Sequence, residues 1–512
     1  MRMFRYLSSL AVSASLAACA VGPDYHTPKI NVPDAFVATS GAVATKVAGS
    51  TNSTLDVAKW WLTLNDSELN SLVERAIQSN PSLEIALTRL QQARTLEVAV
   101  TGVALPELEA SGGAGRGTGS NLTRGRVSPP LNAASNTAGL QQINYVGGFD
   151  AAWEIDVFGR YRRAIEAARY DTQALAAARN AVLITVVADV ARAYLDMRGL
   201  QMQLAVLRQN IRSAQQSLDL VQARFDRGII NELDVTLARR QLATLQAQVA
   251  PMTSQISAAQ YAIAVLLGKF PEDLAKELEK PGLIPQVPEQ VQAGLPLDLI
   301  RRRPDIHEAE WQLAGATARI GVATANLFPR VAITAGGGGQ GQGLGVTPVV
   351  NQSIWSAGVV ATWPLLDFGT LDALVNAADL RTRELLINYR RTVLSAVQDV
   401  DNAISGYASQ QDRLRNLDDA LAASQRAVSL ASQRYDRGLT DYLNVIDAQR
   451  QEYELAEQYA AAQIAVADQF VALYKGLGGG WEQYQTIPPI RQPQPAVVAA
   501  FRRVFDPEDP LK

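Results

Sequence analysis

Few residues in this chain have the types and spacings that catalysis or metal binding requires. The two histidines, His26 and His307, lie far apart, and no group of Cys and His residues has the spacing of a metal site. The run Gly336–Gly339 lacks the Lys and the Ser or Thr that complete a phosphate-binding loop. Asp and Glu are frequent, but on predicted helices, where they keep the surface hydrated. We therefore predict no catalytic residue, no metal and no cofactor, and a protein that is not an enzyme.

Cys19, in contrast, has the surroundings of a modification site. It is the only cysteine, so it cannot form a disulfide within the chain. It follows Leu16-Ala17-Ala18 and a positively charged start. The apolar stretch of that start, residues 7–16, is about half the roughly 20 residues that a membrane-spanning helix needs. The pattern resembles a bacterial lipoprotein signal, in which residues 1–18 are removed and the cysteine is acylated. The alternative is an ordinary signal peptide followed by a free thiol.

Composition excludes some partners and restricts how the chain could cross a membrane. The 512 residues include 47 Lys and Arg against 50 Asp and Glu, so no strongly basic face is available for a nucleic acid. No segment beyond the signal has eighteen uncharged apolar residues in a row. If the protein spans a membrane, it must do so with strands that close into a barrel.

The sequence repeats itself. Residues 224–228, Arg-Phe-Asp-Arg-Gly, recur at 434–438 as Arg-Tyr-Asp-Arg-Gly, an offset of 210. The same offset relates Trp153 to Trp363, and an offset of 223 relates Pro106 to Pro329. A tandem duplication accounts for these pairs. The first copy has thirteen more residues between its proline and its tryptophan, and we predict a loop there.

Each copy contains two kinds of predicted helix. A shorter helix is expected at 66–103 and again at 305–326, each followed by a proline. A much longer helix follows at 160–227, which has no proline and a single glycine. Its 68 residues at 1.5 Å each give roughly 100 Å. Apolar residues along it alternate spacings of three and four, the pattern of coiled-coil packing, and the second copy repeats this register.

Between the two helices of each copy lies a strand-rich stretch. Residues 107–156 and 330–366 are rich in Gly, Ser, Thr, Asn and β-branched residues, and each predicts a β-hairpin. In the second hairpin, Val331–Ala335 and Trp355–Trp363 are the predicted strands, and Gly336–Gly345 is the predicted loop between them.

The long helices are expected to turn back on themselves at Gly228 and Gly438. Pro251 should interrupt the returning helix of the first copy. Helix pairs this long have no globular core, and two β-hairpins cannot close a barrel, because about eight strands is the minimum. We therefore predict a cyclic oligomer whose copies pack around a shared axis.

An ordered set of short motifs resembles one family. The motifs are Cys19–Tyr25, Trp60-Trp61 with Asn65-Asp66, Arg302–Ile306, Ile320–Ala323, Leu327–Pro329, Tyr442–Arg450 and Tyr474–Trp481. Together they span about residues 19 to 485 and resemble the TolC-like outer-membrane factors, in their lipoprotein branch of NodT- and OprM-like proteins. Ala20, rather than Asp, after the cysteine resembles sorting to the outer membrane.

The resemblance implies a mixed α/β membrane protein. A long antiparallel coiled-coil α-barrel would continue into a transmembrane β-barrel of four strands per chain, twelve in a homotrimer. The implied function is the passive exit duct of a tripartite, RND-type efflux system for small molecules. Its partners would be a periplasmic adaptor, an inner-membrane transporter and outer-membrane lipid. The implied location is the outer membrane, lipid-anchored and extending into the periplasm.

The predicted domains follow from the repeat and the signal. Residues 1–18 are the signal peptide and 19–60 a lipidated extension. Residues 61–280 and 285–485 are the two repeats, and 486–512 a Pro-rich tail, disordered or extended.

The family docks its adaptor at the helical tips. The corresponding residues here are Arg224, Phe225, Arg227, Gly228, Leu233, Arg434, Arg437, Gly438 and Leu443. For the arginines, the alternative is solvated charge, and for the glycines it is only a turn.

Three further residues are candidates for a periplasmic gate. Asp447 would form an acidic ring in a trimer, with an ordinary solvated carboxylate as the alternative. Asn444 stands where some members have a second aspartate, and Tyr435 could bond between hairpins or only pack in the seam. Trp153, Trp355 and Trp363 are candidates for membrane-interface aromatics, with strand packing as the alternative.

Two other functions remain open at this point. One is a coiled-coil lipoprotein that tethers the outer membrane without conducting anything, for which the two strand-rich hairpins would be unnecessary. The other is an exit duct for protein secretion.

Overall fold

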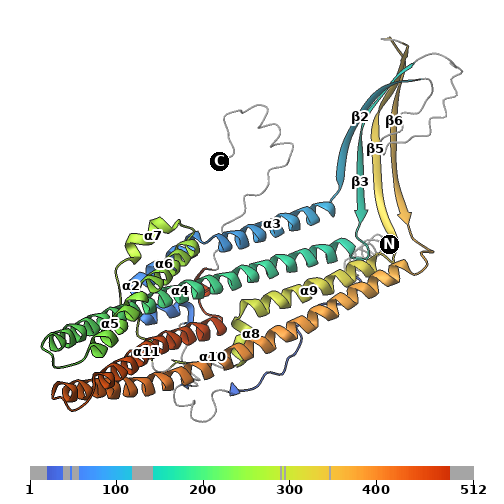
Figure 1. The fold of residues 1–512 in the computed structure, drawn as a ribbon. Helices are drawn as coiled ribbons and strands as arrows, with labels where there is room; N and C mark the ends of the chain where they lie inside the picture. Colours follow the sequence, from blue (N-terminus) through green and yellow to red (C-terminus); the bar gives the residue numbers. More distant parts are fainter. Residues whose placement is uncertain are drawn as a thin grey trace.

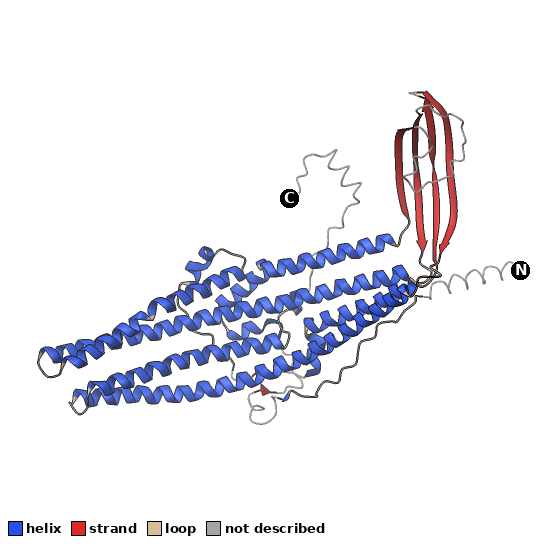
Figure 2. Ribbon diagram, turned by 45° about the vertical axis from the view of Figure 1, so that its right-hand side comes forward, coloured by secondary structure: helices blue, strands red, loops and turns tan. Residues whose placement is uncertain are grey.

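The computed structural model describes residues 20–37, 47–48, 57–117, 142–288, 291–292, 296–344 and 347–484. Long helices lie side by side and a narrow sheet extends from one end of them (Figures 1 and 2). The predictions for Cys19, for the signal peptide and for the Pro-rich tail lie outside the described residues. The loop expected between Pro106 and Trp153 falls on residues 118–141, which also lie outside them.

The first predicted helix is two helices, which corrects the expectation of one helix from 66 to 103. The observed elements are the 3-10 helix η3 (Val57–Leu64), α2 (Ser67–Ser79) and α3 (Pro81–Val103). Asn80 between them is extended, with φ −69° and ψ 125°. The reason is Pro81, which disfavours the helical conformation of the residue before it. The Asn80 side chain then accepts hydrogen bonds from the amides of Ser82 and Leu83 and begins α3.

Four antiparallel strands form the sheet in the order β2-β3-β5-β6. They are β2 (Glu107–Gly117), β3 (Gln142–Ile155), β5 (Arg330–Leu344) and β6 (Thr347–Thr362). The prediction of a loop at Gly336–Gly345 is therefore wrong, because most of this run lies within β5. Gly338 in this run serves packing, because a Cβ there would lie 2.5 Å from the carbonyl oxygen of Gly147 on β3. The two strands approach so closely at this point that they leave no room for a side chain.

The pairing register gives the sheet two different faces. Residues directly opposite one another share a face, and neighbours along a strand alternate. One face is apolar and carries Leu108, Phe149, Trp153, Ile333, Trp355 and Val359. The opposite face is polar and carries Glu107, Glu109, Asp150, Glu154, Thr334 and Ser356. Such alternation suits a sheet with lipid on one side and water on the other.

The predicted long helices are confirmed as α4 (Arg160–Asp226) and α10 (Thr370–Asp436), each of 67 residues. They return as α5 (Glu232–Ala247) with α6 (Val249–Leu266), and as α11 (Tyr442–Gly476). The interruption expected from Pro251 is confirmed. It lies at Gln248, because the proline ring would clash with the carbonyl four residues earlier, that of Ala247.

Shorter elements complete the molecule. They are α7 (Pro271–Leu278), α8 (Pro296–Arg302), α9 (Pro304–Ala325), the pair β1 (Val47–Ala48) and β4 (Val291–Gln292), and η4 (Glu482–Tyr484). One of them, α9, runs from the middle towards the sheet (Figure 1). The largest buried cluster lies in the middle of the molecule and joins residues near the two ends of the described chain. Trp60 stacks on Tyr474 at 5.5 Å and meets the edge of Phe470 at 6.0 Å.

Among the described residues, α4 is the one helix long and apolar enough to cross a bilayer. However, 56% of its apolar stretch is buried inside the molecule. Its core residues, including Leu183, Val190 and Leu195, pack in the large central cluster. The hydropathy of α4 is that of a core helix.

Candidate functional sites at the hairpin tips and the strand–helix joint

The two helical hairpins end beside each other at one end of the molecule, and their turns are built alike (Figures 1 and 2). Gly228 and Gly438 have φ of 70° and 68°, the left-handed conformation that glycine adopts most readily. In the first turn the amide of Ile229 donates to the carbonyl of Arg224 at 3.0 Å. In the second, the amide of Leu439 donates to the carbonyl of Arg434 at 2.9 Å. The expected glycine turns are confirmed.

A small apolar cluster joins the two tips. Its buried residues are Val221, Val235 and Ala238 from the first hairpin, and Tyr435, Tyr442, Val445 and Ile446 from the second. The rings of Tyr435 and Tyr442 lie 5.2 Å apart. Packing of this kind holds the hairpins together in the state described here.

Arg224 links the hairpins across this cluster. Its guanidinium lies 4.7 Å from the centre of the Tyr435 ring, and Nη2 is 2.9 Å from Oδ1 of Asp436. Nη1 also donates to the backbone carbonyl of Tyr435, at 3.4 Å. The sequence predicted that Arg224 contacts a partner protein at the tip. In the structure its side chain, 21% exposed, contacts the second hairpin of its own chain. No sequence signal distinguished it from Arg434, which is exposed.

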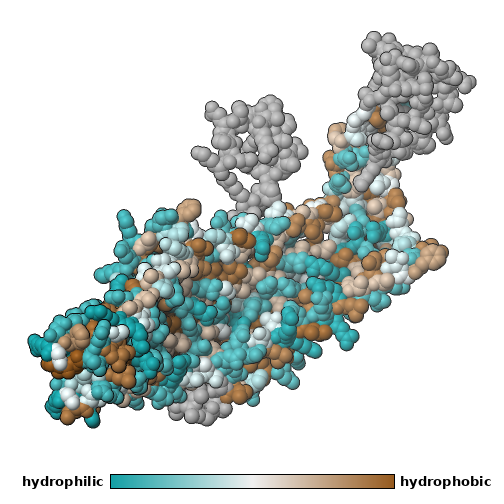
Figure 3. Space-filling view, viewed as in Figure 1, coloured by the Kyte–Doolittle hydropathy of each residue, from teal (hydrophilic) through white to brown (hydrophobic). Residues whose placement is uncertain are grey.

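The surface around the tips is apolar as well as charged. Phe225, Ile229, Leu233, Leu439 and Leu443 are exposed large hydrophobic residues at this end. The space-filling view shows hydrophobic surface there, surrounded by hydrophilic surface (Figure 3). The other predicted arginines, Arg227, Arg434 and Arg437, are exposed too. An exposed apolar patch with a charged rim is typical of a protein interface.

The predicted gate residues lie just beyond the second tip. Asp447 on α11 is 51% exposed and accepts hydrogen bonds from Arg450 at 2.8 Å and Gln451 at 3.0 Å. Asn444 donates to Thr440 at 2.6 Å. The hydroxyl of Tyr435 is buried without a hydrogen-bond partner among the described residues. Burial raises the pKa of Tyr435, so the hydroxyl stays protonated.

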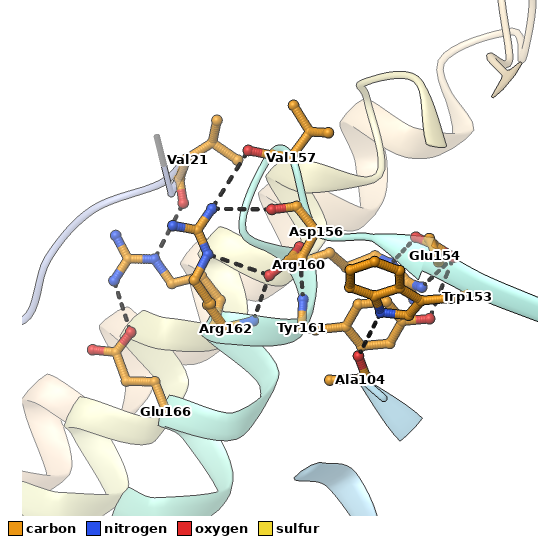
Figure 4. Close-up of polar contacts among 11 residues, drawn as sticks. Val21, Ala104, Trp153, Glu154, Asp156, Val157, Arg160, Tyr161, Arg162 and Glu166 are labelled. Atoms are coloured by element: carbon orange, nitrogen blue, oxygen red, sulfur yellow. Dashed lines mark hydrogen bonds and ion pairs between the residues drawn. The ribbon is translucent and has the colours of Figure 1, made fainter. Parts of the chain in front are cut away.

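At the opposite end, two tryptophans connect the sheet to the helices. The indole of Trp153 donates to the carbonyl of Ala104 at 3.1 Å (Figure 4). The indole of Trp363 donates to the carbonyl of Leu327 at 3.0 Å. The end of β3 is thus bonded to the residue that follows α3. In the same way, the residue after β6 is bonded to the turn that follows α9. Trp355 lies within β6 instead and is 83% exposed on the apolar face.

Ion pairs reinforce the first joint, where β3 turns into α4. Glu154 accepts from Nε and Nη2 of Arg160 at 3.1 and 2.8 Å. Asp156 accepts from the backbone amide of Arg162 at 2.9 Å and so satisfies one of the amides that α4 leaves free at its start (Figure 4). The direction of the sheet relative to the helices is therefore fixed by several independent contacts.

Helical hairpins continuous with an antiparallel sheet define an outer-membrane channel subunit, and solved structures have this fold. The outer-membrane channel OprN superposes with a TM-score of 0.80 at 32% identity, over 91% of this chain and 100% of that one. The open-state MtrE channel of Neisseria gonorrhoeae superposes with a TM-score of 0.74 at 26% identity, over 91% and 99%.

The chain belongs to the outer membrane efflux protein family, whose model matches residues 72–269 and 295–479. The pyoverdine export outer membrane protein OpmQ of Pseudomonas putida is 31% identical, over 94% of this chain and 99% of that protein. Nodulation protein T of Rhizobium leguminosarum is 28% identical, over 98% of each. The predicted NodT- and OprM-like branch is thereby shown. OpmQ is named as an export protein, and OprN and MtrE are named as channels.

Proposed function

We propose that the chain is the passive exit duct of a tripartite efflux system for small molecules, driven by an RND-type inner-membrane transporter. The family supports an outer-membrane efflux channel. The observation that carries the assembly of such a duct is that the sheet of one chain is open in the part of the chain that the structure describes. β2 and β6 are edge strands, and an unpaired edge of this length needs a partner.

A homotrimer would pair these edges and close twelve strands into a barrel. Exposed apolar residues on the two outer helices support the same closure. They are Ile85, Leu96, Val98 and Val103 on α3, and Leu374, Leu380, Ile387 and Leu394 on α10. Because α3 and α10 lie at opposite edges of the helical layer, α10 of one copy would pack against α3 of the next (Figure 1).

The internal repeat gives the register of the missing strand pair. Within the first hairpin Glu107 pairs with Ala152. Applying the two repeat offsets, 223 and 210, converts this into Arg330 with Thr362, which is the observed pair in the second hairpin. The same offsets convert the observed pair of Ala151 and Ala335 into Ala361 of one copy with Gly112 of the next.

Crosslinking tests this register and the trimer together. In a variant with Gly112→Cys and Ala361→Cys, a short bifunctional thiol reagent should produce covalent dimers and trimers. The matched control, Gly112→Cys with Ala357→Cys, keeps the same face but moves one thiol by four residues, about 13 Å along the strand. Equal crosslinking in both variants, or monomers alone, would overturn the proposed assembly.

The anchor and the domain division are part of the same proposal. We infer that residues 1–18 are removed, that Cys19 is acylated and that 19–60 form the lipidated extension. The segments 61–280 and 285–485 would be the two repeats, with 486–512 as the tail. The mass of the N-terminal peptide of the mature protein tests the anchor directly: an unmodified cysteine or an uncut signal contradicts it.

The hairpin tips are the proposed docking site for the periplasmic adaptor. Their exposed apolar residues, with Arg227, Arg434 and Arg437 around them, support a protein partner. Asp447, Asn444 and Tyr435 are the proposed gate. Single-channel recording in planar bilayers tests the duct. An absence of conductance, even after Asp447→Ala, would favour a non-conducting tether, and passage of folded or unfolded polypeptide would favour a secretion duct.

A further inference from the structure

The chain's first described residues bind at the joint between β3 and α4, and the residues that hold them there are called the seat. The amide of Val21 donates to the carbonyl of Phe158 at 3.1 Å. In the opposite direction, Arg163 of α4 donates to the carbonyls of Val21 at 3.2 Å and Gly22 at 3.3 Å. Figure 4 shows Val21 beside the start of α4. Residues 20–27 contain no helix or strand, so these contacts fix their path.

Arg163 is the centre of this seat. It is 5% exposed, and a buried guanidinium is costly unless its donors are paired. Nη2 lies 2.7 Å from Oδ1 of Asp24, and Nη1 lies 2.8 Å from Oε2 of Glu166. Two of its three nitrogens are thus satisfied wholly or partly by residues 21–24. Without that segment, Arg163 would keep Glu166 alone among these partners.

Glycines lie at the points where the segment meets the helix backbones. A Cβ on Gly159 would lie 2.7 Å from Cα of Ala20. A Cβ on Gly321 of α9 would lie 2.8 Å from Cγ of Arg163, and one on Gly22 would strike the backbone of Gly321. Glycine at these positions is what lets the segment lie directly on the backbones of both α4 and α9.

A second set of contacts continues along α9. Tyr25 and Thr27 donate to Oε1 of Glu310 at 3.3 and 3.0 Å. The Tyr25 ring meets the edge of Tyr170 on α4 at 6.1 Å. The segment therefore bridges a helix of the first repeat and a helix of the second. The other copy has no such cover: Gly369, which has the same φ of 82° as Gly159, has nothing within 4 Å of its Cβ position among the described residues.

We propose that residues 20–27 are a strap, held by Arg163, Gly159 and Gly321, that staples α4 to α9 at the joint. The strap does not depend on the proposed acylation of Cys19.

The two equivalent glycines supply a matched test. Gly159→Ala and Gly369→Ala impose the same strain on a left-handed residue, but only the first displaces Ala20. Nitroxide labels at His26→Cys and Arg169→Cys, in trimers diluted with unlabelled protein, report the distance from strap to α4. Wild type and Gly369→Ala should give a single narrow distance. Gly159→Ala and Arg163→Gln should lose it and give a broad distribution.

Asp24→Asn is a milder variant that tests the strap even if Gly159→Ala or Arg163→Gln fails to fold. The Asp24 side chain is 76% exposed, so the substitution removes the ion pair and leaves the core unchanged. It too should broaden the distance. A narrow distance in Asp24→Asn and Arg163→Gln, or equal broadening in both glycine variants, would overturn the strap. If Cys19 proves not to be acylated while the distance between the two labels stays narrow, the proposed anchor is refuted and the proposed strap is not.

Discussion

Replacing Arg224 by Gln tests whether the contact between the hairpin tips keeps the duct closed. The substitution removes the charge that lies over the Tyr435 ring and beside Asp436. It leaves the apolar cluster of the tips in place. Hairpin separation should therefore become easier while each hairpin keeps its own structure.

The magnitude follows from how exposed the contacts are. Asp436 is 54% exposed, so its ion pair contributes about 0.2–1 kcal/mol. The cation–π contact contributes about 0.5–1 kcal/mol at a partly exposed site. The loss of about 1–2 kcal/mol corresponds to a shift of roughly 5- to 30-fold in the equilibrium for separating the two hairpins of one chain.

Open probability in planar bilayers measures this shift, and Arg434→Gln is the matched control. Arg434 is the repeat equivalent of Arg224 but is exposed. Asp436→Asn should reproduce part of the effect, and the double variant should be less than additive because both remove one interaction. If Arg434→Gln opens the channel as much as Arg224→Gln, or if neither changes it, the reasoning is wrong.

Three further predictions concern stability. Gly338→Ala should destabilise the sheet by about 1–3 kcal/mol, because its Cβ meets the facing strand, whereas Gly339→Ala should not, and chemical denaturation of both distinguishes them. Trp363→Phe should cost about 1 kcal/mol through the lost bond to Leu327, measured as a lower melting temperature; no change would remove the proposed role of that bond. Burial raises the pKa of Asp468 to about 6, so its charged form destabilises the fold above that pH and stability should rise as pH falls from 7 towards 4. Asp468→Asn should raise the melting temperature at pH 7.5 and much less at pH 4, and an equal change at both would contradict this.

Local patterns predicted the long elements well. The heptad register and the absence of proline predicted α4, and the turns at Gly228 and Gly438 follow from the conformational freedom of glycine. Pro251 predicted the interruption at Gln248 because the clash of a proline ring is local. These features depend on neighbours within about one helical turn.

Features that depend on distant segments were missed or misassigned. The glycine run in β5 predicted a loop, because nothing nearby in sequence revealed that β3 would lie against it. Arg224 and Arg434 are equivalent in sequence, yet only the position of the neighbouring hairpin decides which one is partly buried. The seat of the strap joins residues about 140 and 300 positions apart. Such contacts follow from the assembled fold rather than from local propensity.

The glycines shared by β3 and β5 have a consequence for cargo. Gly147 lies opposite Gly339, and Gly148 opposite Gly338, so two successive rows carry no side chain on either strand. On these two strands the surface is bare peptide, whose amide groups are already bonded within the sheet, and the same rows carry only Ser111 on β2 and Ser353 and Ile354 on β6. In the proposed barrel, this level would offer a passing molecule few side chains with which to prefer one solute to another.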